Sequence, residues 1–210
     1  MSDQTTSHGD HVRGHAPATL RNREPILAVL RRVLPSAGLL LEIASGTGEH
    51  AAFMTPQFGP GLIWQPSDAR PGALSVIDGY AGDAVCDRIR PAVLLDASTP
   101  VWPVQQADAV FCANMIHISP WTAAEGLFAG AGRLLAAGAA LVLYGPFKRH
   151  GGHTASSNES FEAGLKAKDP RWGVRCLDSE IGPLAAQSGF QMAEVITMPA
   201  NNLMVIFRRM

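Results

Sequence analysis

The chain has 210 residues, which is enough for one ordinary domain with a sizeable core and too few for two. Its formal net charge of -1, with 17% charged residues, lacks the basic field that nucleic-acid binding usually needs, so no nucleic-acid partner is expected. Three cysteines are typical of free thiols in a reducing cytoplasm, rather than of a disulfide framework or a zinc site. We find no membrane-spanning apolar run and no signal-peptide core in residues 1–15, so we expect a cytoplasmic protein without a membrane partner.

The N-terminal segment, residues 1–16, is polar and has no apolar periodicity, so we expect a mobile tail followed by a single domain over residues 17–210. His8, His11 and His15 would share one helical face, which makes a metal cluster one interpretation and a solvated tail the favoured one. Apolar residues at helical spacing over 26–34 then predict an amphipathic helix that starts near Pro25 and stops at Pro35.

The most informative segment is residues 40–49, where an apolar run leads into two glycines and then into a helical pattern. This predicts a buried strand over 38–44 and a helix over 49–58. Gly46 and Gly48 permit the tight turn and the close backbone approach that a nucleotide-like ligand requires.

Strand and helix patterns alternate along the rest of the chain. Further strands are predicted over 62–65, 92–95, 107–113, 139–144, 190–198 and 203–208. Further helices are predicted over 72–81, 158–166 and 179–187. Another helix is predicted to end at Leu135, with Thr122 and Glu125 forming a capping box at its start. This order predicts an α/β fold with a Rossmann-like, doubly wound sheet of seven strands, parallel except for an antiparallel last strand. The pattern indicates no oligomeric state.

Two cofactors fit the glycine turn. Residues 46–51 satisfy the dinucleotide-binding pattern G-x-G-x-x-A. Asp68 lies 20 residues beyond Gly48, about where an acid hydrogen-bonds the ribose in dinucleotide-binding domains. Glu42 opposes this interpretation, because a carboxylate beneath the glycines would repel a pyrophosphate. S-adenosylmethionine carries an ammonium and a sulfonium and no phosphate, so it suits the acid better.

The segment resembles the first motif of the class I S-adenosylmethionine-dependent methyltransferases, acid-x-Gly-x-Gly-x-Gly, with Ala44 in place of the first glycine. By this resemblance Asp68 would bind the ribose, Asp96 with Ala97 would border the adenine, and Asn114 would lie by the methionine part. The predicted cofactor residues are Arg21, Asn22, Glu42, Ala44, Gly46, Gly48, Glu49, Asp68, Asp96, Ala97 and Asn114. Helix capping by Asn22, a turn cap by Asp68 and an Asx turn at Asp96 are the structural alternatives.

A narrower resemblance extends over nearly everything from Pro17 onward. Pro17, Arg21 and Asn22, together with residues 24–27, 42–50, 64–68, 114–121, 144–147 and 198–203, are similar to the family of methyltransferase-like protein 26 and its bacterial relatives. That family is assigned to the methyltransferases by its fold and motifs, so the resemblance implies the cofactor and leaves the acceptor undefined.

The predicted catalytic residues are His117, Asn114 and Tyr144, which follow or end the fourth and fifth strands. His117 could take a proton from a hydroxyl or amine, or it could fix the loop before Trp121. Asn114 could orient substrate or satisfy loop backbone groups. Tyr144 and Lys148 form a Tyr-x-x-x-Lys pair, but Gly145 and Pro146 oppose the helix that would align them.

The loop after the fifth strand suggests a lid over the site. Tyr144, Phe147, Trp121, His150 and His153 could form it, with core packing as the alternative for Tyr144 and Phe147. A metal site on the two loop histidines with His117 is disfavoured, because no carboxylate or cysteine spacing supports it. The expected function is methyl transfer to a small-molecule oxygen, nitrogen or sulfur nucleophile. An NAD(P)-dependent oxidoreductase and a non-catalytic S-adenosylmethionine-binding module are the alternatives.

Overall fold

The computed structural model describes residues 17–210, so the predicted tail and its three histidines lie outside the described residues. The strands are β1 (Ala37–Ile43), β2 (Gly61–Asp68), β3 (Val93–Leu94), β4 (Ala109–Ala113), β5 (Ala140–Gly145), β6 (Phe190–Met198) and β7 (Asn202–Arg209). The helices are α1 (Pro17–Val33), α2 (Glu49–Met54), α3 (Pro71–Asp83), α4 (Trp121–Leu134), α5 (Ser156–Lys168) and α6 (Gly182–Gln187), with short turns η1 (Thr55–Gln57), η2 (Met115–His117) and η3 (Leu177–Ile181).

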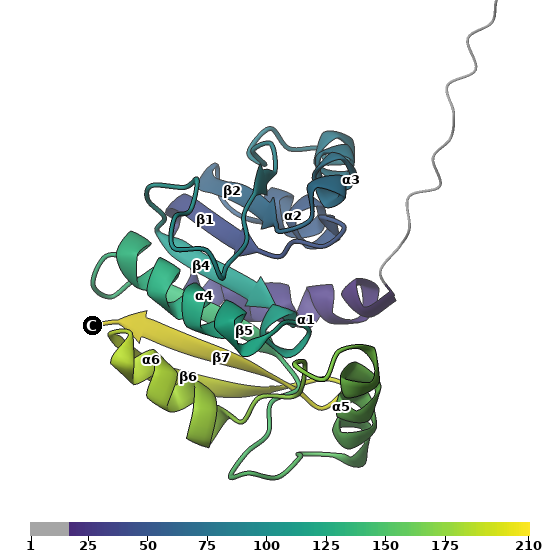
Figure 1. Ribbon diagram of the computed structural model, residues 1–210. Coiled ribbons are helices and arrows are strands. Elements are labelled where there is room, and N and C mark those ends of the chain that lie inside the picture. Colours follow the sequence, from purple (N-terminus) through teal and green to yellow (C-terminus); the bar gives the residue numbers. More distant parts are fainter. Residues whose placement is uncertain (1–16) are drawn as a thin grey trace, which may run out of the picture.

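The strands form one seven-stranded sheet in the order β3-β2-β1-β4-β5-β7-β6 (Figure 1). β1 pairs in parallel with β2 and β4, and the parallel ladder continues to β3 on one side and to β5 on the other. β7 is antiparallel to both β5 and β6. The predicted α/β class and the antiparallel last strand are confirmed.

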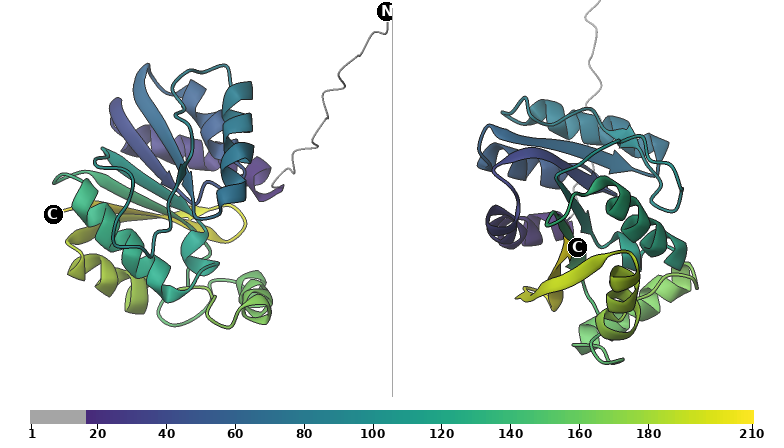
Figure 2. Two further views of the ribbon diagram at one scale, coloured as in Figure 1. Left: turned by 45° about the horizontal axis from the view of Figure 1, so that its top comes forward. Right: turned by 90° about the vertical axis from the view of Figure 1, so that its left-hand side faces the viewer.

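Helices cover both faces of the sheet (Figure 2). α1 and α2 pack on the face that carries Leu40, whereas α4 and α6 pack on the face that carries Leu41. Successive residues of a strand point to opposite faces, so a strand buried on both faces needs an unbroken apolar run. This is why residues 39–41 are all leucine and all buried. Within residues 17–210, no helix combines the length and the apolar composition needed to cross a bilayer.

The first helix is longer than the sequence indicated. It begins at Pro17, so Pro25 lies inside it rather than near its start. A proline within a helix lacks one hydrogen-bond donor, and packing of the apolar face of α1 on the sheet compensates for this loss. Asn22 is therefore a helix-interior residue, and the alternative in which it caps the helix is wrong.

Two other helix boundaries also differ from expectation. α4 begins at Trp121 after Pro120 and has no side-chain cap, so the capping box predicted from Thr122 and Glu125 is absent. The helix predicted over 179–187 is divided into two parts, the π-helical turn η3 and the α-helix α6. Pro183 lies in the first turn of α6. Proline is well tolerated there, because the first helical N–H groups have no partner within the helix.

Candidate functional site

Three cavities adjoin one another at the edge of the sheet where the parallel strands end. The central cavity, of about 680 Å³, lies between α1, the turn after β1 and the start of α3. A second cavity, of about 250 Å³, shares Ala44 with it, and a third, of about 550 Å³, shares Asn22, Asn114 and Ile118 with it. Ligands of open α/β sheets bind at this edge, so the cavities form one candidate site.

The turn between β1 and α2 has a left-handed residue at every second position. Ala44, Gly46 and Gly48 have φ values of 58°, 65° and 85°. A Cβ on Gly48 would lie 2.9 Å from the Cα of Ile77, so this glycine lets α2 approach α3 closely, whereas a Cβ on Gly46 would enter open space. Glycine is preferred in this conformation, which gives a physical reason for the glycine usually found at the position of Ala44.

Asp68 ends β2 directly beside this turn. Its Oδ2 accepts a hydrogen bond from the backbone N–H of Gly46 at 3.0 Å, and the Arg70 guanidinium pairs with Oδ1 at 2.9 Å. Burial alone would raise the pKa of Asp68, but the hydrogen bonds from Arg70 and Gly46 outweigh it and hold that pKa below its usual value. The carboxylate is therefore ionised, and Arg70, whose side chain is largely exposed, covers it.

Glu42 does not face any of the three cavities. Its side chain is enclosed, and its Oε2 accepts hydrogen bonds from Trp64 Nε1 at 3.0 Å and Ser45 Oγ at 2.9 Å. Burial raises the pKa of Glu42 to about 7, despite these two hydrogen bonds. The prediction that Glu42 binds the cofactor stays a prediction; Ser45 and His50, which both line the central cavity, lie beside its carboxyl group.

His50 links Glu42 to helix α1. Its Nδ1 lies 3.8 Å from Glu42 Oε1, and its Nε2 hydrogen-bonds Asn22 Oδ1 at 2.9 Å. The Asn22 amide also hydrogen-bonds the Tyr144 hydroxyl. Burial lowers the pKa of His50 to about 4, so it is neutral. Sequence reasoning missed His50, although its place directly after the glycine turn was a signal. Glu49 accepts a hydrogen bond from Thr47 and does not line the central cavity.

The second cavity lies between the end of β3 and the start of α4. Asp96 and Ala97, which the family resemblance implies would border an adenine, both line it. Asp96 Oδ1 also accepts hydrogen bonds from the backbone and hydroxyl of Ser98, so the Asx turn that was the structural alternative is present as well. The two roles are compatible, because a carboxylate has further acceptor sites.

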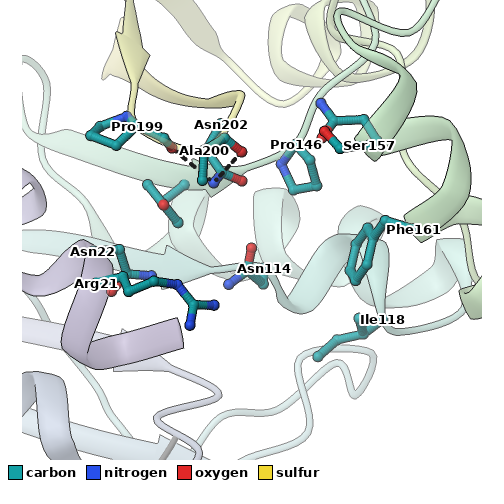
Figure 3. A pocket seen from close by; sticks show the side chains of 12 residues that line it. Arg21, Asn22, Asn114, Ile118, Pro146, Ser157, Phe161, Pro199, Ala200 and Asn202 are labelled. Carbon is teal, nitrogen blue, oxygen red and sulfur yellow. Dashed lines mark hydrogen bonds between the residues drawn. The ribbon is translucent and has the colours of Figure 1, made fainter. Parts of the chain in front are cut away.

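The third cavity opens on the far side of Asn114 (Figure 3). Arg21 reaches into it from α1, and Ile118 and Phe161 lie together on the opposite side. Arg21, predicted beside the cofactor, lines this cavity and not the central one, whereas Asn22 lines both. Asn114 has a φ of 62°, which asparagine tolerates better than most residues, and this conformation places it between the two cavities.

Tyr144 lines the third cavity, and burial raises the pKa of its hydroxyl. Lys148 points elsewhere and pairs with Glu162 at 2.8 Å. The Tyr-x-x-x-Lys spacing is therefore not an aligned catalytic pair, as the intervening glycine and proline indicated.

The predicted aromatic lid is mostly absent. Phe147 is fully buried in the core, and Trp121 lines a separate hollow beside α6. The covering segments are instead α5, through Ser157 and Phe161, and the turn between β6 and β7 (residues 199–201). Asn158 joins them by donating a hydrogen bond to the carbonyl of Asn201 at 2.9 Å. Sequence reasoning missed these residues, and the turn was quoted only as part of a family resemblance.

His117 is fully buried and lines none of the three cavities. Its Nδ1 accepts the backbone N–H of Arg175 at 3.2 Å, and its ring packs edge-on against Phe147 at 4.7 Å. Burial and the charge of Arg175 lower its pKa to about 3, which makes it a weak base. The structure thus favours the loop-fixing alternative for His117 over the role of catalytic base.

The two loop histidines have separate carboxylate partners. His153 Nε2 lies 2.8 Å from Glu162, and the exposed His150 lies 3.8 Å from Asp178. Over the described part of the chain, no group of three or more histidine, cysteine or acidic side chains is arranged to hold a metal ion. A site that combines these two histidines with His117 is not formed.

One family model matches almost the whole chain. It covers residues 13–209 and is described as "Protein of unknown function (DUF938)". The chain belongs to this family.

Solved methyltransferase structures have a similar fold. The mitomycin 7-O-methyltransferase MmcR has a TM-score of 0.76 at 17% identity, over 92% of this chain and 54% of that one. CalO1, a methyltransferase in calicheamicin biosynthesis in its SAH-bound form, has a TM-score of 0.71 at 16% identity, over 90% and 54%. An O-methyltransferase family 2 protein from Planctomyces limnophilus DSM 3776, in complex with apigenin, has a TM-score of 0.73 at 18% identity, over 90% and 62%. The chain spans about half the length of the first two, and the likeness is one of fold.

Proposed function

We propose that this member of the DUF938 family is an S-adenosylmethionine-dependent methyltransferase that acts on a small molecule. The observation that carries the proposal is the line of three adjoining cavities around the glycine turn, with Ala44 between the first two and Asn114 between the last two. Adenine, the ribose with the methionine part, and an acceptor would occupy them in turn. The fold shared with a methyltransferase that was solved with bound SAH supports the choice of cofactor.

The charges at the glycine turn favour S-adenosylmethionine over a dinucleotide. The N–H of Gly46 is already bound by the ionised carboxylate of Asp68, and the N–H of Gly48 donates to the carbonyl of Ser45. A diphosphate at this turn would meet a carboxylate where it needs free N–H groups. A ribose hydroxyl can instead donate to Asp68, in place of the exposed Arg70.

In this proposal some of the predicted residues would contact the cofactor, and Glu42 would hold other side chains in place. Gly46, Asp68 and Asn114 would contact the cofactor in the central cavity, and Asp96 with Ala97 would border the adenine. Glu42 would act as a positioning residue that holds Ser45 and His50. These two side chains line the cavity beside Asn22.

Bound S-adenosylmethionine supplies a methyl group that its sulfonium already activates, so the protein can contribute mainly by positioning the two reactants. Asn114 lies at the boundary between cofactor and acceptor cavities, where its amide can orient the reacting group. Asn22 and Tyr144 are joined by a hydrogen bond and line the acceptor side of this boundary. The enclosing walls of α1 and α5 would restrict water near the reaction.

The similarity to the methyltransferase-like protein 26 family agrees with the assigned cofactor. The free thiols of Cys112 and Cys176, both buried, are consistent with a reducing cytoplasm as the location.

Calorimetry with S-adenosylhomocysteine tests the proposal, and two glycines provide matched variants. Gly46 and Gly138 both have left-handed backbone conformations with φ of 65° and 83°, and an added Cβ would meet nothing within 4 Å at either position. Gly46→Ala and Gly138→Ala therefore carry a similar backbone cost, but only the first intrudes on the central cavity. We expect binding by the wild type and by Gly138→Ala, and a loss of roughly tenfold or more in Gly46→Ala.

A folded wild-type protein that does not bind S-adenosylhomocysteine at millimolar concentration would refute the proposal. Thermal stabilisation by NAD or NADP in that case would indicate an oxidoreductase. Binding without methyl release to any acceptor in broad panels and cell extract would indicate a binding module.

A further inference from the structure

Among the described residues, the acceptor cavity is lined by one charged side chain, that of Arg21, and by no acid. Arg21 is an exposed residue of α1 with no carboxylate partner within residues 17–210, and its charge acts against the rise in the pKa of the Tyr144 hydroxyl that burial causes. An unpaired guanidinium facing a cavity favours an anionic ligand, and its planar fork fits a carboxylate with two hydrogen bonds.

The rest of the cavity presents an apolar surface. Ile118 and Phe161 keep 42% and 41% of their surface exposed, and with Pro146 they face the cavity opposite Arg21 (Figure 3). The nearby amides of Asn158 and Asn202 donate to backbone carbonyls of the turn between β6 and β7, so they are engaged in holding that turn. The volume of about 550 Å³ is that of a site for a small organic molecule.

None of the described side chains that line this cavity is a base at neutral pH. Its polar members are arginine, asparagine, serine and tyrosine. His117 is enclosed in the core, and His50, which lines the central cavity, has its Nε2 bound to Asn22. A hydroxyl or an ammonium group would need a base to become a nucleophile. A carboxylate needs none, because it is ionised at neutral pH.

We propose that the acceptor is a small carboxylic acid with an apolar body, which Arg21 binds by its carboxylate, and that a carboxylate oxygen receives the methyl group. This inference rests on the methyltransferase function proposed above. The carboxylate oxygen forms a bond to the methyl carbon while the carbon–sulfur bond of the sulfonium breaks and its electron pair stays on sulfur. A neutral methyl ester and a neutral thioether result, and no proton is transferred.

The binding half of the proposal is tested on the full chain saturated with S-adenosylhomocysteine. Benzoate, 4-hydroxycinnamate and indole-3-acetate are titrated by calorimetry, each beside its own methyl ester. We expect at least one acid to bind roughly tenfold more tightly than its ester, and Arg21→Gln to remove that preference while leaving the ester affinity unchanged. Arg90→Gln is the matched control, because Arg90 is exposed and lines none of the cavities.

The site of transfer is tested with labelled S-adenosylmethionine and 4-hydroxycinnamate, which offers both a carboxylate and a hydroxyl. We expect the label in a base-labile ester. Equal affinity for acid and ester in all three pairs, an acid preference that persists in Arg21→Gln, or label in a base-stable ether would overturn the inference. In each case intact binding of S-adenosylhomocysteine would leave the methyltransferase proposal standing. If the wild-type protein does not bind S-adenosylhomocysteine, the proposed function itself is overturned. The titrations of acids and esters, repeated without cofactor, would then still decide whether Arg21 binds a carboxylate.

Discussion

Replacing Glu42 by glutamine should stabilise the protein at alkaline pH and change its stability little at acidic pH. The carboxyl group is enclosed, and its burial raises its pKa from 4.5 to about 7. Above pH 7 the folded protein must hold a buried negative charge that the unfolded chain leaves in water. Below pH 4.5 the group is neutral in both states, so this cost disappears.

The size of the effect follows from the two pKa values. A rise from 4.5 to about 7 corresponds to a cost of roughly 3 kcal/mol once both states are ionised. Between pH 5 and pH 8 the advantage of Glu42→Gln should therefore grow by roughly 2 to 3 kcal/mol. The glutamine carbonyl can still accept the hydrogen bonds from Trp64 and Ser45 at 3.0 and 2.9 Å, so the comparison isolates the charge.

Urea unfolding followed by tryptophan fluorescence at several pH values provides the measurement. Subtracting the wild type from the variant cancels the opposite pH dependence of the buried His50 and His117, whose lowered pKa values destabilise the fold as the pH falls. Glu125→Gln, at an exposed position of α4, serves as the control. An advantage for Glu42→Gln that is constant with pH, or larger at pH 5 than at pH 8, would refute this reasoning.

Three further predictions concern the turn, the buried histidine and the ion pair beside the turn. Ala44→Gly should raise the free energy of unfolding by up to about 1 kcal/mol, because it relieves the strain of a left-handed alanine. Gly48→Ala should lower that free energy by about 2 kcal/mol, because its Cβ would collide with the backbone of α3. Urea unfolding in which Ala44→Gly is the less stable of the two variants would contradict this prediction. Between pH 5 and pH 8 the kcat/KM of the wild type and that of His117→Gln should depend on pH in the same way, because the pKa of His117 is about 3. A decline below pH 6.5 that only the wild type shows would restore the catalytic base. Arg70→Ala should tighten S-adenosylhomocysteine binding a few-fold in calorimetry, because Asp68 no longer has to release its exposed partner, and weaker binding would show that Arg70 contacts the ligand itself.

Much of the architecture could be predicted from the sequence, because it depends on local patterns. The unbroken apolar run before Gly46 predicts a strand buried on both faces, and β1 runs from Ala37 to Ile43 with its last five residues buried. The same logic placed Asp68, Asp96 and Asn114 at the ends of successive strands, where the sheet brings them to one edge.

Helix boundaries were predicted less well. α1 begins eight residues before Pro25, because packing of its apolar face against the sheet outweighs the hydrogen bond lost at proline. The capping pattern at Thr122 is equally local, and it was overridden by Pro120, which sets where α4 begins. In both cases tertiary packing or backbone geometry decided between signals of similar local strength.

By itself, the sequence determined the order of strands and helices, the glycine turn and the edge of the sheet where the candidate site lies. Only the tertiary structure decided that Glu42 is enclosed behind Ser45, that His117 is buried, and that Arg21 faces the cavity covered by α5. The physical reason is that periodicity assigns a residue to a strand end or a helix face. The direction and charge environment of its side chain depend instead on segments distant in the chain, such as Asn158 and Asn201, which meet across 43 residues.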